Sequence, residues 1–310
     1  MGITIIHDFT EINKDELNKL YGNIRDYYHA FEKSYLAVFG FEEKKLIGAA
    51  RIISEGVETA LLVDLQVVKG YGLSVKKELV DTLESKLADR RVMVYSKKDD
   101  LNFWEEIGYG RCKNAWTYFK DSLSESEFLP SGYKYENEFV SNSVPTLKNP
   151  QKTEIVYKAG YENATFEDIN ELLTKAFWGH QHDINKTTAA FVNSQYAVSA
   201  FDGNKLVGIA RAVSDLEHYA TILNVAVDPE YQGLSIGKKV VLKLSELIHA
   251  EVVVLNTHPG AIGFYNGLKE YRRNKYVFEK HISGGIGTEM PLEKRNAMFT
   301  PKGYKFPDEY

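Results

Sequence analysis

The sequence predicts an α+β protein in which one domain occurs twice. The segment KLIGAAR at residues 45–51 returns as KLVGIAR at 205–211, 160 positions later, and residues 69–74 resemble 232–237 at an offset of 163. Nearly constant offsets indicate duplication with loop insertions. A solenoid is excluded, because its repeats span about 20 to 50 residues and need at least three copies. The length of 310 residues fits two domains, since one domain takes about 100 to 200 residues.

Within each copy, apolar runs and helical periodicity predict elements in a fixed order. A strand comes first, at 3–6 and 154–159, followed by helical segments at 15–31 and 166–193. Three further strands, a helix and another strand complete the pattern at 35–41, 45–53, 60–68, 73–87 and 91–95 in the first copy, and at 196–201, 206–213, 220–227, 234–248 and 252–255 in the second.

Residues 140–153 separate the copies. This stretch contains Ser, Asn and two Pro residues and has no periodicity, which is typical of a linker. We therefore expect an N-terminal domain at 1–139 and a C-terminal domain at 154–310. The stretch 284–310 resembles 129–139 and is expected to pack as part of the fold.

The most informative stretch joins the strand 220–227 to the helix 234–248. Asp228 and Pro229 end the strand, and a turn with small residues opens the helix. The first N–H groups of a helix have no intrahelical partner, and the helix dipole favours negative charge there, so the turn is suited to a pyrophosphate. The residues expected to form this site are Val225, Ala226 and Val227 of the strand, and Gln232, Gly233, Leu234, Ser235, Ile236, Gly237 and Lys238 of the turn.

Two better-known phosphate motifs do not fit. A P-loop needs four residues between its glycines and a Ser or Thr after its Lys, whereas three residues separate Gly233 from Gly237, and Lys238 is followed by Lys239. A dinucleotide-binding fingerprint needs Gly-x-Gly-x-x-Gly, which the turn lacks. The turn therefore belongs to another class.

The turn resembles the acetyl-CoA signature of GNAT-family N-acetyltransferases, Gln/Arg-x-x-Gly-x-Gly/Ala after a Val-x-Val strand. Gln232 and Gly237 fit this signature, and Ser235 replaces its middle glycine. Downstream, Phe264 and Tyr265 resemble the family's closing Phe-Tyr-x-x-x-Gly-Phe pattern, with the glycine displaced.

The resemblance covers residues 165–278 and implies tandem domains, each with a mostly antiparallel mixed sheet flanked by helices. It implies an acyltransferase that moves the acetyl group of its cosubstrate acetyl-CoA directly to an amine. If the strand bulges, backbone N–H groups at 225–227 polarise the thioester carbonyl. Tyr265 then protonates the CoA sulfur, and Asn256 contacts the pantetheine arm. Tyr265 as an aromatic core anchor and Asn256 as a turn former remain alternatives.

The second copy is expected to be the catalytic one. The loop between strand and phosphate turn is three residues shorter in the first copy, and Trp104 stands where the second copy has Tyr265. An indole N–H only donates and cannot release a proton at accessible pH, unlike a phenol. The first copy is therefore interpreted as degenerate, although Gly70 and Gly72 retain a phosphate turn.

An ammonium must lose a proton before it attacks, and no single base stands out. Asn224 takes the strand position at which the first copy has Asp64, and an amide cannot act as a base. The His-x-His-Asp pattern in the predicted substrate loop suggests a metal, but metal sites need three or four converging ligands, so a polar loop is favoured and no metal is expected. The remaining candidates for the base are Glu217, His218, His180, His182 and Asp183.

Composition limits the function. A net charge of −5 with 44% hydrophobic and 26% charged residues describes an ordinary soluble protein without the basic face of a nucleic-acid binder. No apolar run reaches the roughly 18 residues of a membrane span, and the N-terminus lacks the pattern of a signal peptide. The single Cys112 forms no internal disulfide, so the cytoplasm is the expected compartment.

The expected partner is a small-molecule amine substrate. Neither nucleic acid nor membrane is expected as a partner, and a homodimer is left open. Two other functions also stay open: a non-catalytic sensor or scaffold that binds acyl-CoA or a metabolite, and acetylation of a protein or peptide. Tyr265 discriminates catalysis from binding, since a binding module tolerates the loss of its hydroxyl.

Overall fold

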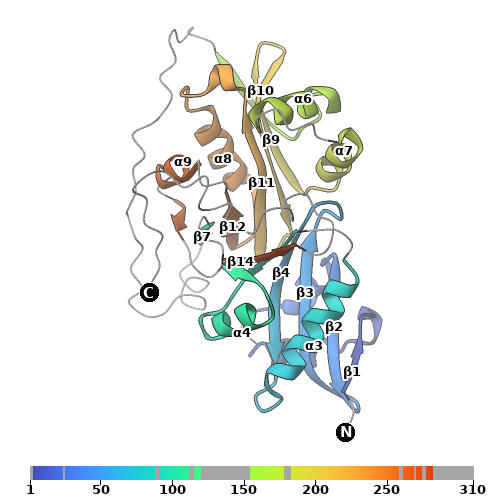
Figure 1. Cartoon of the computed structure of the whole chain (residues 1–310). Helices are drawn as coiled ribbons and strands as arrows, with labels where there is room; N and C mark the ends of the chain where they lie inside the picture. Colours follow the sequence, from blue (N-terminus) through green and yellow to red (C-terminus); the bar gives the residue numbers. More distant parts are fainter. Residues whose placement is uncertain are drawn as a thin grey trace. The chain divides into compact units, whose positions relative to one another are not determined.

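The computed structural model describes residues 3–23, 25–87, 91–111, 115–119, 154–177, 183–257, 261–268, 270–273 and 277–281. The chain forms two compact units, and each is an α+β domain with a mixed sheet flanked by helices (Figure 1). The predicted fold class is therefore confirmed. No helix within the described ranges is long and apolar enough to cross a membrane.

The first unit contains a seven-stranded sheet in the order β1-β2-β3-β4-β5-β14-β6, in which β4 and β5 are parallel. Its strands are β1 (Ile3–Ile6), β2 (Leu36–Glu42), β3 (Lys45–Ser54), β4 (Thr59–Val67), β5 (Arg91–Tyr95), β6 (Gly110–Arg111) and β14 (Val277–His281). Its helices are α1 (Lys14–Leu20), α2 (Tyr27–Glu32), α3 (Gly72–Ser85) and α4 (Leu101–Glu106), with 3-10 turns η1 (Phe9–Glu11) and η2 (Lys98–Asp100).

The second unit repeats this plan in the order β13-β7-β12-β11-β10-β9-β8, with β11 and β12 parallel. Its strands are β7 (Ala115–Phe119), β8 (Ile155–Ala159), β9 (Tyr196–Asp202), β10 (Lys205–Ser214), β11 (Tyr219–Val227), β12 (Val252–Asn256) and β13 (Arg272–Arg273). Its helices are α6 (Phe166–Ala176), α7 (Ile184–Val192), α8 (Ile236–Leu247) and α9 (Ile262–Asn266), with the 3-10 turn η3 (Pro229–Tyr231).

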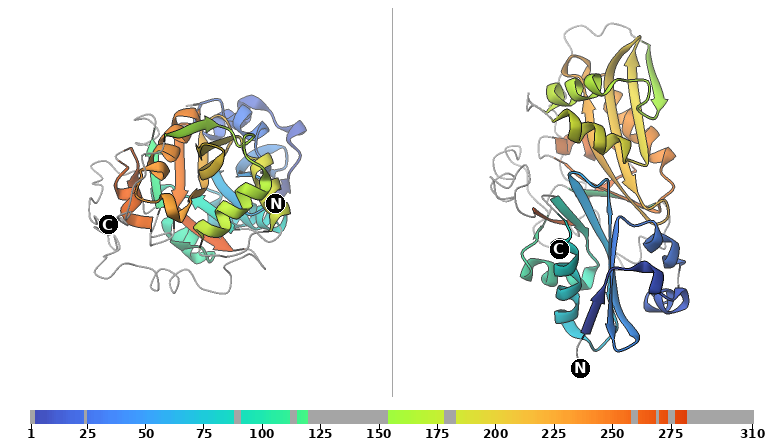
Figure 2. Two further views of the ribbon diagram at one scale, coloured as in Figure 1. Left: turned by 90° about the horizontal axis from the view of Figure 1, so that it is seen from above. Right: turned by 90° about the vertical axis from the view of Figure 1, so that its right-hand side faces the viewer.

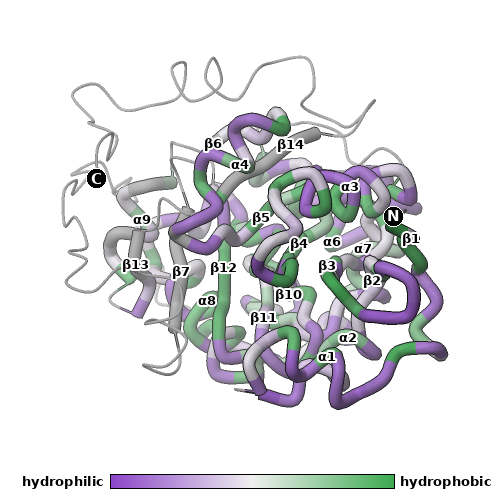
Figure 3. Tube along the Cα trace, turned by 90° about the horizontal axis from the view of Figure 1, so that it is seen from below, coloured by the Kyte–Doolittle hydropathy of each residue, from purple (hydrophilic) through white to green (hydrophobic). Residues whose placement is uncertain are grey.

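Helices cover both faces of the second unit's sheet (Figure 2). α8 packs against β9, β10 and β11 on one face, and α6 packs against β10 and β11 on the other. Apolar side chains fill both layers, and in Figure 3 β12 is hydrophobic while many connecting turns are hydrophilic. The first unit has the same layers, with α3 on one face and α1 and α2 on the other.

Local signals explain where α6 begins. The Thr165 hydroxyl accepts a hydrogen bond from the Asp168 N–H at 3.1 Å, and the Asp168 carboxylate accepts one from the Thr165 N–H at 3.2 Å. This capping box holds the first turn. Ile169, Leu172 and Leu173 then recur at helical spacing and are buried, so the helix presents an apolar stripe to the sheet.

The predicted elements are confirmed in both copies, and most boundaries agree within two residues. Each long helical segment is two helices, α1 and α2 in the first copy and α6 and α7 in the second. The predicted linker 140–153 and the related segments 129–139 and 284–310 lie outside the described residues.

Two strands cross the predicted division into 1–139 and 154–310. β7 comes from the first copy's sequence but lies between β12 and β13 in the second unit, with Val252 opposite Phe119 and Asn256 opposite Ala115. β14 comes from the second copy but lies between β5 and β6 in the first unit. Sequence reading places a strand by its neighbours in the chain, whereas backbone pairing decides which sheet it joins. The structure therefore corrects the predicted boundaries at these two strands.

We expect residues 154–310 expressed alone to be much less stable than the whole chain. Without β7, the backbone groups along one edge of β12 lose their partners, and each lost hydrogen bond costs about 1 kcal/mol against a total stability of roughly 5–15 kcal/mol for a domain. Thermal unfolding followed by circular dichroism measures this loss. A protease site engineered within 140–153 of the full chain is the control, because the cut chain retains β7 and is expected to stay folded. A fragment that melts with the intact chain would contradict the role of the exchanged strand.

Candidate functional site

A β-bulge interrupts β11 near its C-terminal end. Ile209 of β10 lies opposite Ala226, and Arg211 lies opposite Leu223, so two β11 residues, Asn224 and Val225, oppose one residue of β10. Asn224 adopts the left-handed conformation with φ 50°. The first copy has the same bulge, with Asp64 at φ 54°. The predicted contact between the thioester and the backbone of Val225, Ala226 and Val227 requires a bulge in this strand. The structure contains that bulge.

A buried arginine holds the bulge. Arg211 on β10 is 1% exposed, and its Nε donates to Asn224 Oδ1 at 2.6 Å. Its Nη1 donates to Ser194 Oγ at 3.1 Å and to the Ala190 carbonyl, in the last turn of α7, at 3.4 Å. The guanidinium also lies 5.7 Å from the centre of the Phe191 ring. One side chain thus joins β10, the bulge and the end of α7.

The first copy repeats this arrangement with an ion pair. Arg51 Nε donates to Asp64 Oδ2 at 2.6 Å, and Arg51 Nη1 donates to the Ala30 carbonyl at 3.1 Å and to Ser34 Oγ at 3.3 Å. Neither arginine was among the residues predicted from the sequence to form a site. The sequence does contain a sign of this clamp. Both repeats have an arginine inside an apolar strand, and the following strand has Asp in one copy and Asn in the other.

The parallel strands β11 and β12 separate before the bulge. Their ladder runs from Tyr219 opposite Val252 to Thr221 opposite Val254 and then ends. In the first unit the ladder continues one pair further, to Leu62 opposite Val94. Residues 222–227 thus pair with β10 but lie beyond the part of β11 that pairs with β12, at the place where the sequence predicts a thioester. Asn256, the predicted pantetheine contact, is half-buried at the end of β12.

The predicted phosphate turn lies directly after β11. Asp228 accepts a hydrogen bond from the Glu230 N–H at 3.0 Å and starts η3, and α8 begins after Ser235, which has φ 60° and makes no side-chain cap. The first N–H groups of α8 therefore receive no cap from Ser235. In the left-handed region a non-glycine residue costs about 1–2 kcal/mol, which explains why glycine is favoured at this position in the signature.

The turn residues differ in exposure. Gln232 and Leu234 are half-buried, and Gly233, Ser235 and Lys238 are exposed. Ile236 and Gly237 are buried, so the Ile236 side chain serves packing and only its backbone faces the turn. A Cβ at Gly237 would stand 3.2 Å from a Phe264 ring carbon and 3.3 Å from Val227, so only glycine fits without displacing a neighbour.

Helix packing corrects the alignment of the two turns. The residues of α3 and α8 that face the core match at an offset of 161, not 163: Val75 with Ile236, Leu79 with Val240, and Leu83 with Leu244. The sequence Gly-Leu-Ser at 72–74 therefore corresponds to 233–235, and both glycines have positive φ. The buried apolar positions of the two helices set this register, whereas similarity within the short loops favours an offset of 163.

With this register, Lys76 takes the place of Gly237. The Lys76 ammonium pairs with Asp100 and lies 5.9 Å from the centre of the Phe103 ring. In addition, α3 already begins at Gly72, whereas α8 begins three residues after the corresponding glycine. A lysine side chain and an earlier helix start thus alter the first copy's turn.

Tyr265 lies on α9 and is 5% exposed within the second unit's core. Burial raises the pKa of its phenol well above the usual range, opposed by a hydrogen bond with the Thr257 side chain. The hydroxyl therefore stays protonated at physiological pH, as a proton donor must. The surrounding core shows that Tyr265 also packs, so the structure is compatible with both roles predicted for it.

The first copy's Trp104 is 2% exposed. No described residue accepts a hydrogen bond from its Nε1. The ring packs edge-on against Phe103 and Tyr109. Its role in the first unit is therefore that of a core aromatic residue.

Two candidate bases lie far from the bulge. His218 precedes β11 and contacts Glu251 at 3.3 Å, and Glu217 is its neighbour. Asn224 lies six positions after His218, and at about 3.3 Å per residue along an extended strand this is roughly 20 Å. Asp183 caps α7 by accepting a hydrogen bond from the Asn185 N–H at 2.9 Å. His180 and His182 lie outside the described residues, and the described part of the chain contains no group of three or more possible metal ligands.

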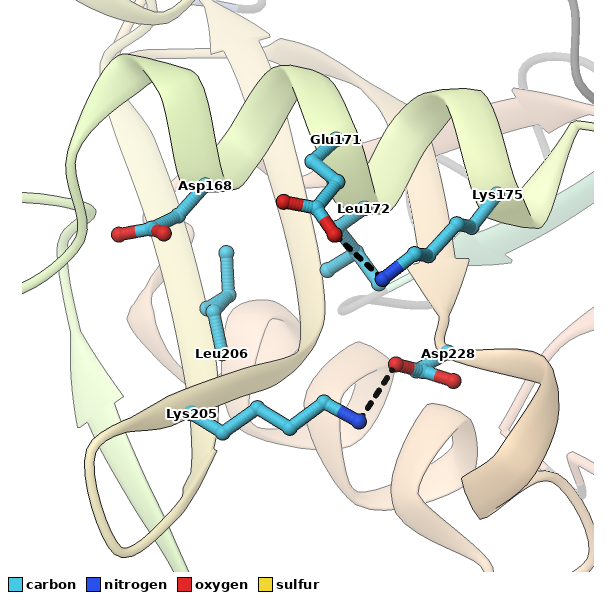
Figure 4. A pocket seen from close by; sticks show the side chains of 7 residues that line it. All are labelled: Asp168, Glu171, Leu172, Lys175, Lys205, Leu206 and Asp228. Carbon is cyan, nitrogen blue, oxygen red and sulfur yellow. Dashed lines mark hydrogen bonds and ion pairs between the residues drawn. The ribbon is translucent and has the colours of Figure 1, made fainter.

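A hollow beside α6 is separate from these features. It is lined by Asp168, Glu171, Leu172, Lys175, Lys205, Leu206 and Asp228 (Figure 4). Its charges pair with one another, since Lys205 Nζ lies 3.1 Å from Asp228 Oδ2 and Lys175 pairs with Glu171 at 2.5 Å. Neither the bulge nor the start of α8 lines it, so the hollow is not the acyl-transfer site.

Comparison with known proteins relates these features to a family. Residues 165–268 match the model of the Acetyltransferase (GNAT) family. An uncharacterized N-acetyltransferase, ycf52, of Porphyra purpurea is 32% identical over 146 residues, which cover 44% of this chain and 83% of that protein. A Glycine max protein named histone acetyltransferase TAP1 is 29% identical over 180 residues, covering 54% of this chain and 76% of that one.

Among solved structures, the chain resembles a tandem GNAT protein from the clavulanic acid biosynthesis pathway. The TM-score is 0.51 at 13% identity, and the alignment covers 91% of this chain and 99% of that one. At this identity the similarity concerns the fold, and it extends over both units.

We predict that Gly237→Glu abolishes acetyl-CoA binding by the second unit. The new side chain must displace Phe264 and sets a carboxylate beside the expected pyrophosphate, so we expect a loss of at least roughly 100-fold in affinity, about 2.7 kcal/mol, by calorimetry. Lys76→Glu, the matched change in the first copy, is expected to leave this affinity unchanged, and thermal melting verifies that both variants fold. Unchanged affinity in a folded Gly237→Glu chain would refute the assignment of the turn.

Proposed function

The chain belongs to the GNAT family of acetyltransferases, and we propose that its second unit transfers the acetyl group of acetyl-CoA directly to a small amine. The observation that carries the assignment to this unit is the exposure of the bulge. Asn224, Val225 and Val227 are partly exposed, whereas their first-copy counterparts are buried. A thioester must reach these backbone groups to react there.

The first copy's bulge is covered from within its own unit. The Tyr21 hydroxyl donates to the Asp64 carbonyl, and Tyr21 stacks on Tyr27 with ring centres 4.3 Å apart. Within the described residues, no side chain donates to the Asn224 carbonyl in the second unit. The cover over Asp64 and the lysine in place of Gly237 both support a first unit without acyl-transfer activity.

The second unit's residues have complementary roles in the proposed transfer. The N–H groups at the start of α8 hold the pyrophosphate, and the N–H groups at 225–227 stabilise the negative charge that develops on the thioester oxygen. The amine nitrogen forms a bond to the carbonyl carbon, the carbon–sulfur bond breaks, and Tyr265 supplies a proton to the departing sulfur. The amine's proton leaves through water or a base on the chain.

We expect Tyr265→Phe to lower kcat by roughly 10²-fold or more, the range of general acid catalysis, while acetyl-CoA affinity stays within about twofold. The phenyl ring retains the packing and only the proton donor is lost. Steady-state kinetics and calorimetry on the same preparation separate the two effects. Trp104→Phe is the control and is expected to change neither quantity. Equal losses of rate and affinity in Tyr265→Phe would indicate a packing role instead.

Calorimetric titration of the intact chain with acetyl-CoA is expected to give one site per chain. Two sites would contradict a degenerate first unit, and no binding would overturn the proposed function. Release of CoA thiol should then be measured with small amines and with a lysine peptide, because one relative is named a histone acetyltransferase. A preference for the peptide would replace the small amine as acceptor, and binding without turnover of any acceptor would favour a sensor or scaffold.

A further inference from the structure

The Asn224 side chain occupies a particular position in the proposed transfer site. It belongs to the bulge, it is partly exposed, and it is the neighbour of the N–H groups assigned to the thioester oxygen. Any acceptor whose nitrogen attacks that thioester passes within reach of the bulge residues. Groups on Asn224 that the protein does not use are therefore available to the acceptor.

Arg211 determines how the Asn224 amide is turned. A guanidinium only donates hydrogen bonds, so the atom 2.6 Å from Arg211 Nε is the amide oxygen. The amide is planar, and its NH₂ group consequently points away from Arg211. Ser194 and the Ala190 carbonyl hold the guanidinium in turn, so this orientation is fixed by three elements.

The NH₂ group of Asn224 has no hydrogen-bond acceptor among the residues that the structure describes. It also lies on the side of the sheet away from the phosphate turn, because Arg211 faces Phe191 of α7 while α8 packs on the opposite face. We expect the acceptor to approach from this side, where α6 and α7 lie, because the start of α8 is assigned to the phosphates of acetyl-CoA.

We propose that the Asn224 NH₂ group binds a hydrogen-bond-accepting oxygen of the acceptor, so that the enzyme selects amines with an ether, hydroxyl or carbonyl oxygen a few bonds from the reacting nitrogen. This inference rests on the proposed function of the second unit. The first copy cannot make the contact, because the Asp64 carboxylate offers no donor and Tyr21 covers its backbone.

Asn224→Asp tests the proposal without breaking the clamp. The first copy shows that a carboxylate at this position accepts the same hydrogen bond from arginine at the same 2.6 Å, so the variant is expected to fold. The probes are 2-methoxyethylamine and butylamine, which have the same chain length and differ by an oxygen in place of a methylene. Comparing the ratio of their kcat/KM values between native and variant cancels the difference in amine basicity.

We expect this ratio to fall about fivefold to tenfold in Asn224→Asp, the range expected for one lost hydrogen bond, with acetyl-CoA affinity unchanged. Asp64→Asn is the matched control and should leave the ratio unchanged. A ratio that persists in a folded Asn224→Asp chain would overturn the proposal, since a merely structural role predicts that result.

A binding measurement keeps the test independent of turnover. In the CoA-saturated chain, the ¹⁵N–¹H signal of the Asn224 amide, assigned by its loss in Asn224→Asp, is expected to shift with 2-methoxyethylamine and not with butylamine. An unmoved signal, or equal shifts with both amines, would overturn the proposal. A selective shift without any turnover would support the contact while the proposed transfer fails, so the two failures are distinguishable.

Discussion

The second unit depends on the buried guanidinium of Arg211. Placing a charge in the interior costs several kcal/mol unless hydrogen bonds replace the lost water, and Arg211 meets this demand by donating to the Asn224 amide, Ser194 and the end of α7. The contact with Asn224 holds the residue that has the left-handed conformation in the bulge of β11. The buried guanidinium of Arg211 needs hydrogen-bond acceptors, and one of them lies in the bulge at which the chemistry is proposed to occur.

Both units retain this frame and differ in what surrounds it. In the first unit Asp64 pairs with Arg51, Tyr21 covers the bulge, and Lys76 fills the position of a glycine. Asp64 and Lys76 each add an ion pair, and the Tyr21 hydroxyl occupies the Asp64 carbonyl at the bulge. Both copies keep the left-handed bulge residue, and the first has additional contacts around it, as expected of a duplicated domain that is free to accumulate stabilising contacts.

The exchanged strands join the two units in a different way from a flexible linker. Each unit completes its sheet with a strand encoded in the other copy, so β12, which ends at Asn256, pairs with β7, and β5 pairs with β14. The first copy is therefore expected to be required for a stable second unit even if, as proposed, it has no acyl-transfer activity. This gives a physical reason for retaining both copies in one chain.

The elements and the duplication follow from the sequence alone, and so does the prediction of a phosphate-binding turn, because periodicity, repeated segments, glycine spacing and the pair Asp228 and Pro229 are visible in the chain itself. The exchange of β7 and β14 between the two sheets is seen only in the tertiary structure, because the residues of β7 do not indicate which sheet the strand joins. Tertiary packing also shows that Lys76, not a glycine, is the first-copy residue that corresponds to Gly237. This correspondence depends on which faces of α3 and α8 are buried. The orientation of Asn224 likewise depends on Arg211, which is distant in sequence and adjacent only after β10 and β11 have paired.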